Sequence, residues 1–263
     1  MVIKKYSRIN YRNKEERLVR EKGAYGHFPD HAVKWCLQSQ NLILSDVNRI
    51  AVSRDCTKYP TRMIQRLLGL RFKIGMKKGY RYRSSINSES NQFSLWNTLY
   101  LHLPNTFRQK IRDRLRMFGH KGDTPIIEFV PHHLSHAYQV YYQSPFTNSS
   151  VLVIDGSGEE HTVSGFSVEN GVFKKVICYD IPQSLGWFYS GFTAYLGFQP
   201  SRDEPKLMGL AAFGEQRKNN NPWIERLDKI LHVGNEHFEI DPLFFKFGGN
   251  EFHRDILITW LNS

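Results

Sequence analysis

Cysteine is scarce in this 263-residue sequence, which contains only Cys36, Cys56 and Cys178 and no C-x-x-C pair. An odd, sparse set of this kind excludes a disulfide framework and indicates buried thiols in a reducing compartment. The first 22 residues are charged throughout and lack the apolar segment of a secretory signal. No stretch approaches the ~20 uninterrupted apolar residues of a membrane-spanning helix. The sequence therefore predicts a cytoplasmic protein with no membrane partner.

Low-complexity tracts and internal repeats are also lacking. Hydrophobic residues make up 40% of the chain and charged residues 23%, which is ordinary for a folded protein and excludes extensive disorder. The length allows one large domain or two lobes with a proper core. The formal net charge of +11 favours an anionic partner. Nucleic acid, nucleotides and phosphorylated substrates all fit, and the charge alone does not choose between them.

Hydrophobic periodicity predicts alternating helices and strands before residue 148. Helices are expected after Pro29-Asp30, over residues 106–118 and over residues 133–142, with strands over residues 46–52 and 126–130.

A meander of three strands is expected from residue 149 onward. The segments are 149–155, which reads as a buried strand, 162–168 and 172–181, followed by a buried helix near residues 184–196. Asn170-Gly171 is a strong hairpin signal between the second and third strands. We therefore expect one lobe over residues 1–148 and the start of a second lobe over residues 149–263.

The segment "PHHLSHA", residues 131–137, carries a candidate metal site. His132 and His136 lie four residues apart, so a helix would direct both imidazoles to one side, where they could bind a divalent metal. A cluster of surface or core histidines is the plainer alternative. His133 points about 100° away on a helix, so it would contact a ligand or simply pack.

The segment "VLVIDGSGEE", residues 151–160, ends an apolar strand at Asp155. A carboxylate at this position could complete a site made by two histidines. The glycines Gly156 and Gly158 flank Ser157 and allow the backbone to approach a phosphate closely. An ordinary hairpin turn is the alternative, because Asp-Gly is a common turn dipeptide.

Two further segments have plainer readings. Residues 184–198, "SLGWFYSGFTAYLGF", alternate small and aromatic residues and favour a tightly packed core helix. In "DEPKLMGLAAFGE", residues 203–215, Lys206 lies among apolar residues between two turns. This lysine would meet an anionic ligand or remain a solvated loop charge.

The sequences of these segments, and their order along the chain, resemble those of the carbamoyltransferase family of nodulation, cephamycin and tobramycin tailoring enzymes. The resemblance rests on "HHLSHA", "VLVIDGSGE", "SLGWFYSGFTAYLGF" and "KLMGLAAFGE", and on the upstream segment "EERLVREKGAYGHFPDHAVKWCL". It covers roughly residues 15–215 and concerns the N-terminal domain of the family. It implies an α/β fold with two actin/hexokinase-like (ribonuclease H-like) lobes, of which the second is incomplete here.

The resemblance also implies a reaction. A separate domain makes carbamoyl adenylate from carbamoyl phosphate and ATP, and the N-terminal domain transfers the carbamoyl group to a hydroxyl of a sugar or natural product. A divalent metal of the iron type positions the donor. His132, His136 and Asp155 would bind this metal. The residues predicted to contact the donor are His133, Gly156, Ser157, Gly158 and Glu159. Lys206 would lie in the cleft as a candidate catalytic residue.

The sequence departs from the family at several points. Residues 1–14 do not resemble the usual first strand and its "H-D-S/A-A" turn, and "LAAFG" stands where "LAPYG" is commoner. The glycine-rich adenosine segment, a downstream aspartate ligand and the adenylate-forming domain are not found. We therefore expect a chain that is truncated at both ends, which a split or truncated gene, a second chain that supplies the rest, or an inactive degraded paralogue would explain. The incomplete lobe would expose apolar surface and favour aggregation or association.

A nucleic-acid-binding module is the alternative from a different class of function. It depends on the net charge and on the basic stretch of residues 62–83, which Tyr80 and Tyr82 interrupt. Such a module would bind nucleic acid with a steep dependence on salt.

Overall fold

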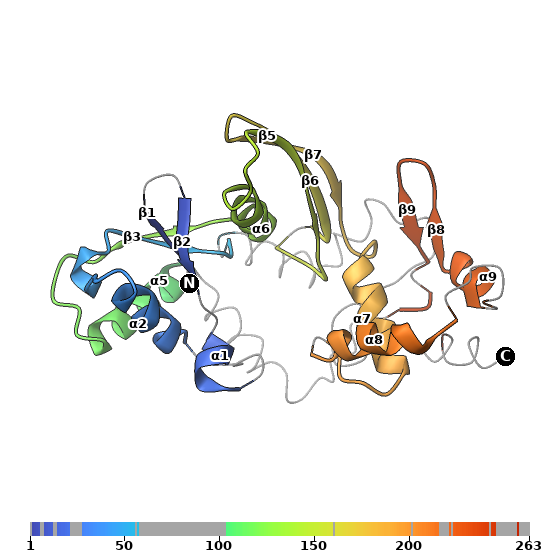
Figure 1. Ribbon diagram of the computed structural model, residues 1–263, viewed down its shortest axis with the longest axis horizontal. Helices are drawn as coiled ribbons and strands as arrows, with labels where there is room; N and C mark the ends of the chain where they lie inside the picture. Colours follow the sequence, from blue (N-terminus) through green and yellow to red (C-terminus); the bar gives the residue numbers. More distant parts are fainter. Residues whose placement is uncertain are drawn as a thin grey trace. The chain divides into compact units, whose positions relative to one another are not determined.

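The computed structural model describes residues 2–5, 8–12, 15–21, 28–55, 57, 104–159, 161–200, 202–215, 221, 223–241, 243–245 and 257. Helices and short strands follow one another along these segments (Figure 1), so the predicted mixed α/β class is confirmed. The basic stretch of residues 62–83 lies outside the described residues. Among the described residues, no helix is both long and apolar enough to cross a membrane.

The chain divides into two compact units, Met1–Arg20 with Gly26–Ser135 and Glu21–Tyr25 with His136–Ser263. The division falls inside helix α6, His132–Tyr141, which is one continuous helix. The lobe boundary expected between residues 148 and 149 stays a prediction.

The first unit is built around a pair of parallel strands and a basic helix. Its elements are β1 (Val2–Lys5), β2 (Arg8–Arg12), α1 (Glu15–Val19), α2 (Asp30–Gln38), η1 (Leu44–Asp46), β3 (Arg49–Val52), α5 (Pro104–Met117) and β4 (Ile126–Phe129). β3 pairs with β4, and Ile111 and Leu115 of α5 pack with Ile127 of β4 in a core cluster. Ile111 and Leu115 lie four residues apart, so both side chains are on the same face of the helix. The strand expected from residue 46 begins at Arg49, because residues 44–46 form a 3-10 turn.

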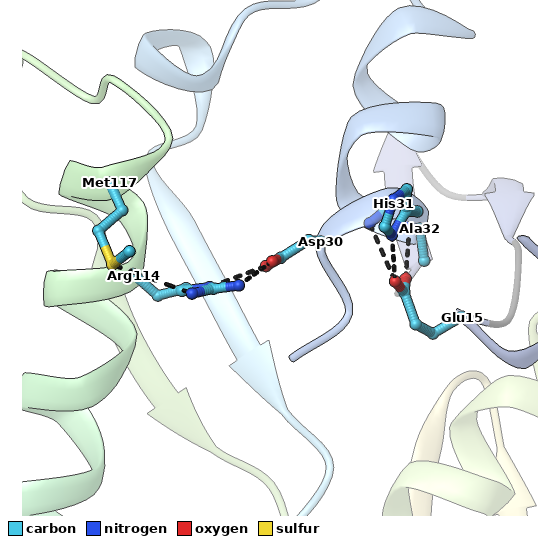
Figure 2. A network of polar contacts seen from close by, with 6 residues as sticks. All are labelled: Glu15, Asp30, His31, Ala32, Arg114 and Met117. Atoms are coloured by element: carbon cyan, nitrogen blue, oxygen red, sulfur yellow. Dashed lines mark hydrogen bonds and ion pairs between the residues drawn. The ribbon is translucent and has the colours of Figure 1, made fainter. Parts of the chain in front are cut away.

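A network of polar contacts joins three helices of this unit. Figure 2 shows Glu15 of α1 accepting hydrogen bonds from the backbone nitrogens of His31 and Ala32, at 3.2 and 2.8 Å, in the first turn of α2. The Nδ1 atom of His31 lies 2.6 Å from the same carboxylate. Asp30 pairs with Arg114 of α5. Glu15 therefore satisfies backbone donors at the start of α2 and ties α1 to it, and Asp30 ties α5 to the same helix.

The second unit contains the predicted meander. β5 (Asn148–Ile154), β6 (Val163–Glu169) and β7 (Val172–Tyr179) form an antiparallel sheet in the order β5-β6-β7. Asn170 and Gly171 have φ angles of 49° and 79°, the left-handed conformations that a tight hairpin requires. The hairpin prediction is therefore confirmed. Tyr138 and Tyr141 of α6 pack edge-on against Phe173 of β7, with ring centroids 4.6 and 5.2 Å apart.

Helix α7 (Leu185–Tyr195) follows the meander and confirms the helix predicted there. Its buried residues, Ser190, Gly191 and Thr193, are small, whereas Phe188 and Phe192 are partly buried and pack against a core cluster that includes Ile240 and Phe245. The remaining elements are α8 (Glu204–Leu210), η4 (Ala211–Phe213), α9 (Trp223–Asp228), β8 (Leu231–Val233) and β9 (Phe238–Ile240). β8 and β9 form a hairpin that the sequence did not predict.

Candidate functional site

Helix α6 positions the two histidines of the predicted metal site. β4 ends at Phe129, and Pro131 precedes the first residue of the helix, His132. His132 and His136 are one turn apart, which places their side chains on the same side of α6.

The ring of His132 is oriented by the backbone. Its Nδ1 atom lies 3.2 Å from the carbonyl oxygen of Ser53, just beyond the end of β3. Because a carbonyl oxygen only accepts, Nδ1 carries the proton in this contact and Nε2 is left as the basic nitrogen. This is the usual arrangement for a histidine that binds metal through Nε2.

Asp155 follows β5 and presents its two carboxylate oxygens differently. Oδ1 accepts a hydrogen bond of 2.7 Å from the backbone nitrogen of Gly156. Oδ2 lies 3.9 Å from Nε2 of His136. Gly156 therefore sets the rotation of the carboxylate so that one oxygen faces the histidine.

The structure brings the three predicted metal ligands together. One ligand atom from each of His132, His136 and Asp155 lies within 4.8 Å of the other two. Two ligands at about 2.1 Å from one ion can be at most about 4.2 Å apart, so the pair formed by His136 and Asp155 fits directly. The ligand atoms of the full set lie within 4.8 Å of one another, slightly more than this limit. Two imidazoles and a carboxylate are a donor set that suits first-row divalent metals.

The start of α7 fixes the turn that carries Asp155. The hydroxyl of Ser184, the N-cap residue, donates a hydrogen bond of 2.7 Å to the carbonyl oxygen of Gly156 and accepts one of 3.1 Å from the nitrogen of Trp187. At Gly186 a Cβ atom would lie 2.4 Å from the nitrogen of Gly156. The helix therefore approaches the turn so closely that only glycine fits.

Of the other residues predicted to contact the donor, Gly156, Ser157, Gly158 and Glu159 lie in the connection between β5 and β6, and His133 lies on α6. The nitrogen of Gly158 donates a hydrogen bond of 2.8 Å to the carbonyl oxygen of His161, so the connection has the character of a hairpin loop. Ser157 is exposed. Glu159 and His133 are buried, each with 5% of its surface exposed. The donor-binding role of these residues stays a prediction.

Lys206 lies in a different local structure from the one expected. It belongs to the first turn of α8 instead of a segment between two turns, because Asp203, Glu204 and Pro205 start a helix there. Its Nζ atom lies 3.0 Å from Oδ1 of Asp203. A role of Lys206 in the cleft remains a prediction.

Sequence reasoning missed a second histidine–carboxylate pair in this unit. Nδ1 of His161 lies 2.7 Å from Oδ1 of Asp180, which follows β7. No local motif marks this pair, because the two residues meet only when β6 and β7 are aligned. Sequence reasoning also missed the contact of Ser184 with the turn at Asp155 and Gly156, although a serine before an apolar helix is an N-cap signal.

Comparison with known sequences decides the family. The sequence pattern of the family described as carbamoyltransferase N-terminus matches residues 1–248. This chain belongs to that family. The resemblance seen in the motifs of residues 15–215 is thereby confirmed, and the match extends beyond them at both ends.

Several relatives resemble this carbamoyltransferase domain. An uncharacterised protein of Synechocystis, sll1178, is 31% identical over 205 residues, which are 77% of this chain and 31% of the relative. The nodulation protein NolNO of Sinorhizobium fredii is 29% identical over 232 residues, which are 87% of this chain and 29% of the relative. The uncharacterised protein MJ1058 of Methanocaldococcus jannaschii is 35% identical over 159 residues, 55% of this chain and 24% of that protein. The chain thus spans about a third or less of these relatives.

Proposed function

We propose that this chain is the transferase part of an O-carbamoyltransferase with a two-lobed actin/hexokinase-like fold. It transfers the carbamoyl group of carbamoyl adenylate, made from carbamoyl phosphate and ATP, to a hydroxyl of a sugar or natural product. The observation that carries the proposal is the convergence of His132, His136 and Asp155 in a member of the carbamoyltransferase family.

In this proposal a divalent metal, with iron as the expected ion, binds to His132, His136 and Asp155. Such an ion, when bound, polarises the carbonyl of the donor and stabilises the negative charge that develops on its oxygen. Ser53 orients His132 through its carbonyl, and Gly156 orients Asp155 through its nitrogen. Because these contacts already restrict the two side chains, His132 and Asp155 would lose less conformational freedom when a metal binds.

The turn after Asp155 would bind the donor. Gly156, Ser157, Gly158 and Glu159 lie next to the metal-ligand cluster in the sequence, and the two glycines allow a ligand to approach the backbone closely. Ser184 and Gly186 keep this turn in place from the start of α7. His133 and Lys206 are proposed to contribute to the same cleft.

A transfer assay tests the proposal. The chain is loaded with ferrous iron and mixed with ATP, radiolabelled carbamoyl phosphate, a range of oligosaccharide acceptors and the part of NolNO that lies outside the matched region. We expect label in an acceptor, loss of this label with His136→Ala, and retention with His232→Ala, which changes an exposed histidine of β8. If no acceptor is labelled although the chain binds metal, it is an inactive member of the family.

A further inference from the structure

Helix α5 is strongly basic, and most of its charge is not neutralised by the protein. The helix and the turn after it, residues 104–121, contain six lysine or arginine residues and one aspartate. Arg114 pairs with Asp30 of α2 (Figure 2). Within the part of the chain that the structure describes, four of the other cations have no carboxylate partner: Arg108, Lys110, Arg112 and Lys121. The helix therefore offers several cations to an anionic partner.

Three arginines form a row along one side of α5. Arg108, Arg112 and Arg116 are four residues apart, so they follow one another on the helix surface at steps of about 6 Å along its axis. The Nε atom of Arg112 is buried and has no hydrogen-bond partner. Nη1 of Arg116 lies 3.4 Å from Oδ1 of Asp113, but both side chains are mostly exposed, so this pair contributes little. We call these three arginines the arginine row.

The arginine row begins beside the end of β4, from which the chain continues to His132. The guanidinium of Arg108 lies over the ring of Phe129, the last residue of β4, with 4.6 Å between Cζ and the ring centroid. His132 follows three residues later, so its Cα lies within about 11 Å of that of Phe129. One turn further along α5, Ile111 packs with Ile127, so the helix runs antiparallel to the strand. The row therefore leads away from the candidate metal ligand His132, within the first unit.

The chemistry of the arginine row selects anions that have two oxygens in one plane. A guanidinium donates two parallel hydrogen bonds to a carboxylate or a phosphate, which a lysine does not do. The net charge of +11 attracts a ligand that carries several such groups. A linear chain with repeated acidic groups can contact successive arginines of the row.

The residues beside the arginine row favour a saccharide as this chain. Asn105 and Gln109 are exposed and precede Arg108 and Arg112 by three residues, so they are neighbours of the row on the helix surface. Their amides both donate and accept hydrogen bonds, as sugar hydroxyls require. Single-stranded nucleic acid commonly stacks its bases on aromatic rings. The one aromatic residue of α5, Phe107, is partly buried against the core cluster of the first unit.

We propose that the arginine row binds an acidic saccharide chain through its carboxylate or phosphate groups and leads it toward His132 as the acceptor of the carbamoyl transfer. The role as acceptor rests on the proposed function. Binding to the row requires neither the metal nor the carbamoyl donor, so it can be measured by itself.

A binding experiment with three hexasaccharides tests the proposal. The metal-free chain is titrated at low salt with a galacturonate hexamer, with phosphorylated maltohexaose and with neutral maltohexaose. We expect at least one of the two acidic hexamers to bind, which tells carboxylate from phosphate, and the neutral hexamer to bind at least about tenfold more weakly. Arg112→Ala should weaken acidic binding about tenfold, because it removes charge-assisted hydrogen bonds.

The matched control is Lys110→Ala, which removes the same charge from an exposed residue of the same helix. Residues two apart in a helix do not share a face, so Lys110 lies away from the arginine row. This variant should change the affinity less than about twofold. Circular dichroism of each variant shows that α5 is still folded.

Four results would overturn the proposal. They are no binding of either acidic hexamer, equal binding of the neutral hexamer, equal affinity of Arg112→Ala and wild type, and an equal loss with Lys110→Ala. A single-stranded DNA hexamer that binds more tightly than the saccharides, and that Arg112→Ala releases, would make nucleic acid the partner instead. Iron content is measured on the same proteins. A wild-type chain that binds an acidic hexamer but no iron contradicts the proposed metal site and leaves the arginine row as a saccharide-binding surface.

Discussion

Replacing Gly186 by alanine is expected to disturb the turn that carries Asp155. A Cβ atom at this position would lie 2.4 and 2.6 Å from the nitrogen and Cα of Gly156 and 2.7 Å from the carbonyl carbon of Asp155. All three are backbone atoms, so no side-chain rotation relieves the overlap. The helix α7 and the turn must move apart, which also breaks the hydrogen bond between Ser184 and Gly156.

The size of the effect follows from these contacts. Overpacking of a well-packed site costs about 1–3 kcal/mol, and contact with backbone places Gly186→Ala at about 3 kcal/mol. For a chain of this size, 1 kcal/mol lowers Tm by about 2–4 °C, so we expect a decrease of about 6–12 °C. Since Asp155 shifts with the turn, the affinity for divalent metal should fall as well.

Thermal unfolding followed by circular dichroism, with metal titration of the folded protein, measures both effects. Gly209→Ala is the matched control, because Gly209 is also in a helix but a Cβ there meets nothing within 4 Å. Alanine should leave Tm unchanged or raise it at this position, since glycine in a helix costs about 0.5–1 kcal/mol. A Gly186→Ala protein with the Tm and metal affinity of the wild type would refute the reasoning.

Two other changes have defined outcomes. Ser184→Ala removes the N-cap hydrogen bond to Trp187 and should destabilise the protein by about 1–2 kcal/mol in denaturant titrations, whereas Ser184→Thr should recover most of the loss; equal stability of Ser184→Ala and wild type would contradict this. Burial would raise the pKa of Glu15, but the hydrogen bonds that it accepts at the start of α2 lower the pKa below its ordinary value. Its stabilising contribution is therefore present above the pKa of the unfolded chain and lost as the pH falls through the folded-state pKa. Glu15→Gln should be less stable than the wild type at neutral pH, and the difference should shrink in acid; a difference that is independent of pH would argue against the assignment.

The elements with strong local signals were predictable from the sequence. The meander follows from alternation and from Asn170-Gly171, and α6 follows from the periodic apolar residues after Pro131. The spacing of His132 and His136 places both on one side of a helix without knowledge of the fold. Their approach to Asp155 depends on how α6 packs on the sheet, which only the structure shows.

The features that escaped prediction arise from contacts distant in sequence or from weak signals. The fit of Gly186 against Gly156 joins residues thirty positions apart, and no pattern within α7 indicates it. β8 and β9 are three residues each, too short to show alternation. Leu152 and Ile154 of β5 are exposed, so the prediction of a buried strand is wrong for this face, because an apolar run indicates burial without showing which faces are covered.

The most direct test of the central claim is the metal content of the chain after anaerobic loading with ferrous iron and removal of excess ion, determined by mass spectrometry of the element. The account predicts about one ion per chain for the wild type and for His232→Ala, and loss of the ion with His136→Ala or Asp155→Ala, all four proteins having the same far-ultraviolet circular dichroism. A wild-type chain that retains no metal, or a His136→Ala chain that retains as much as the wild type, would contradict it.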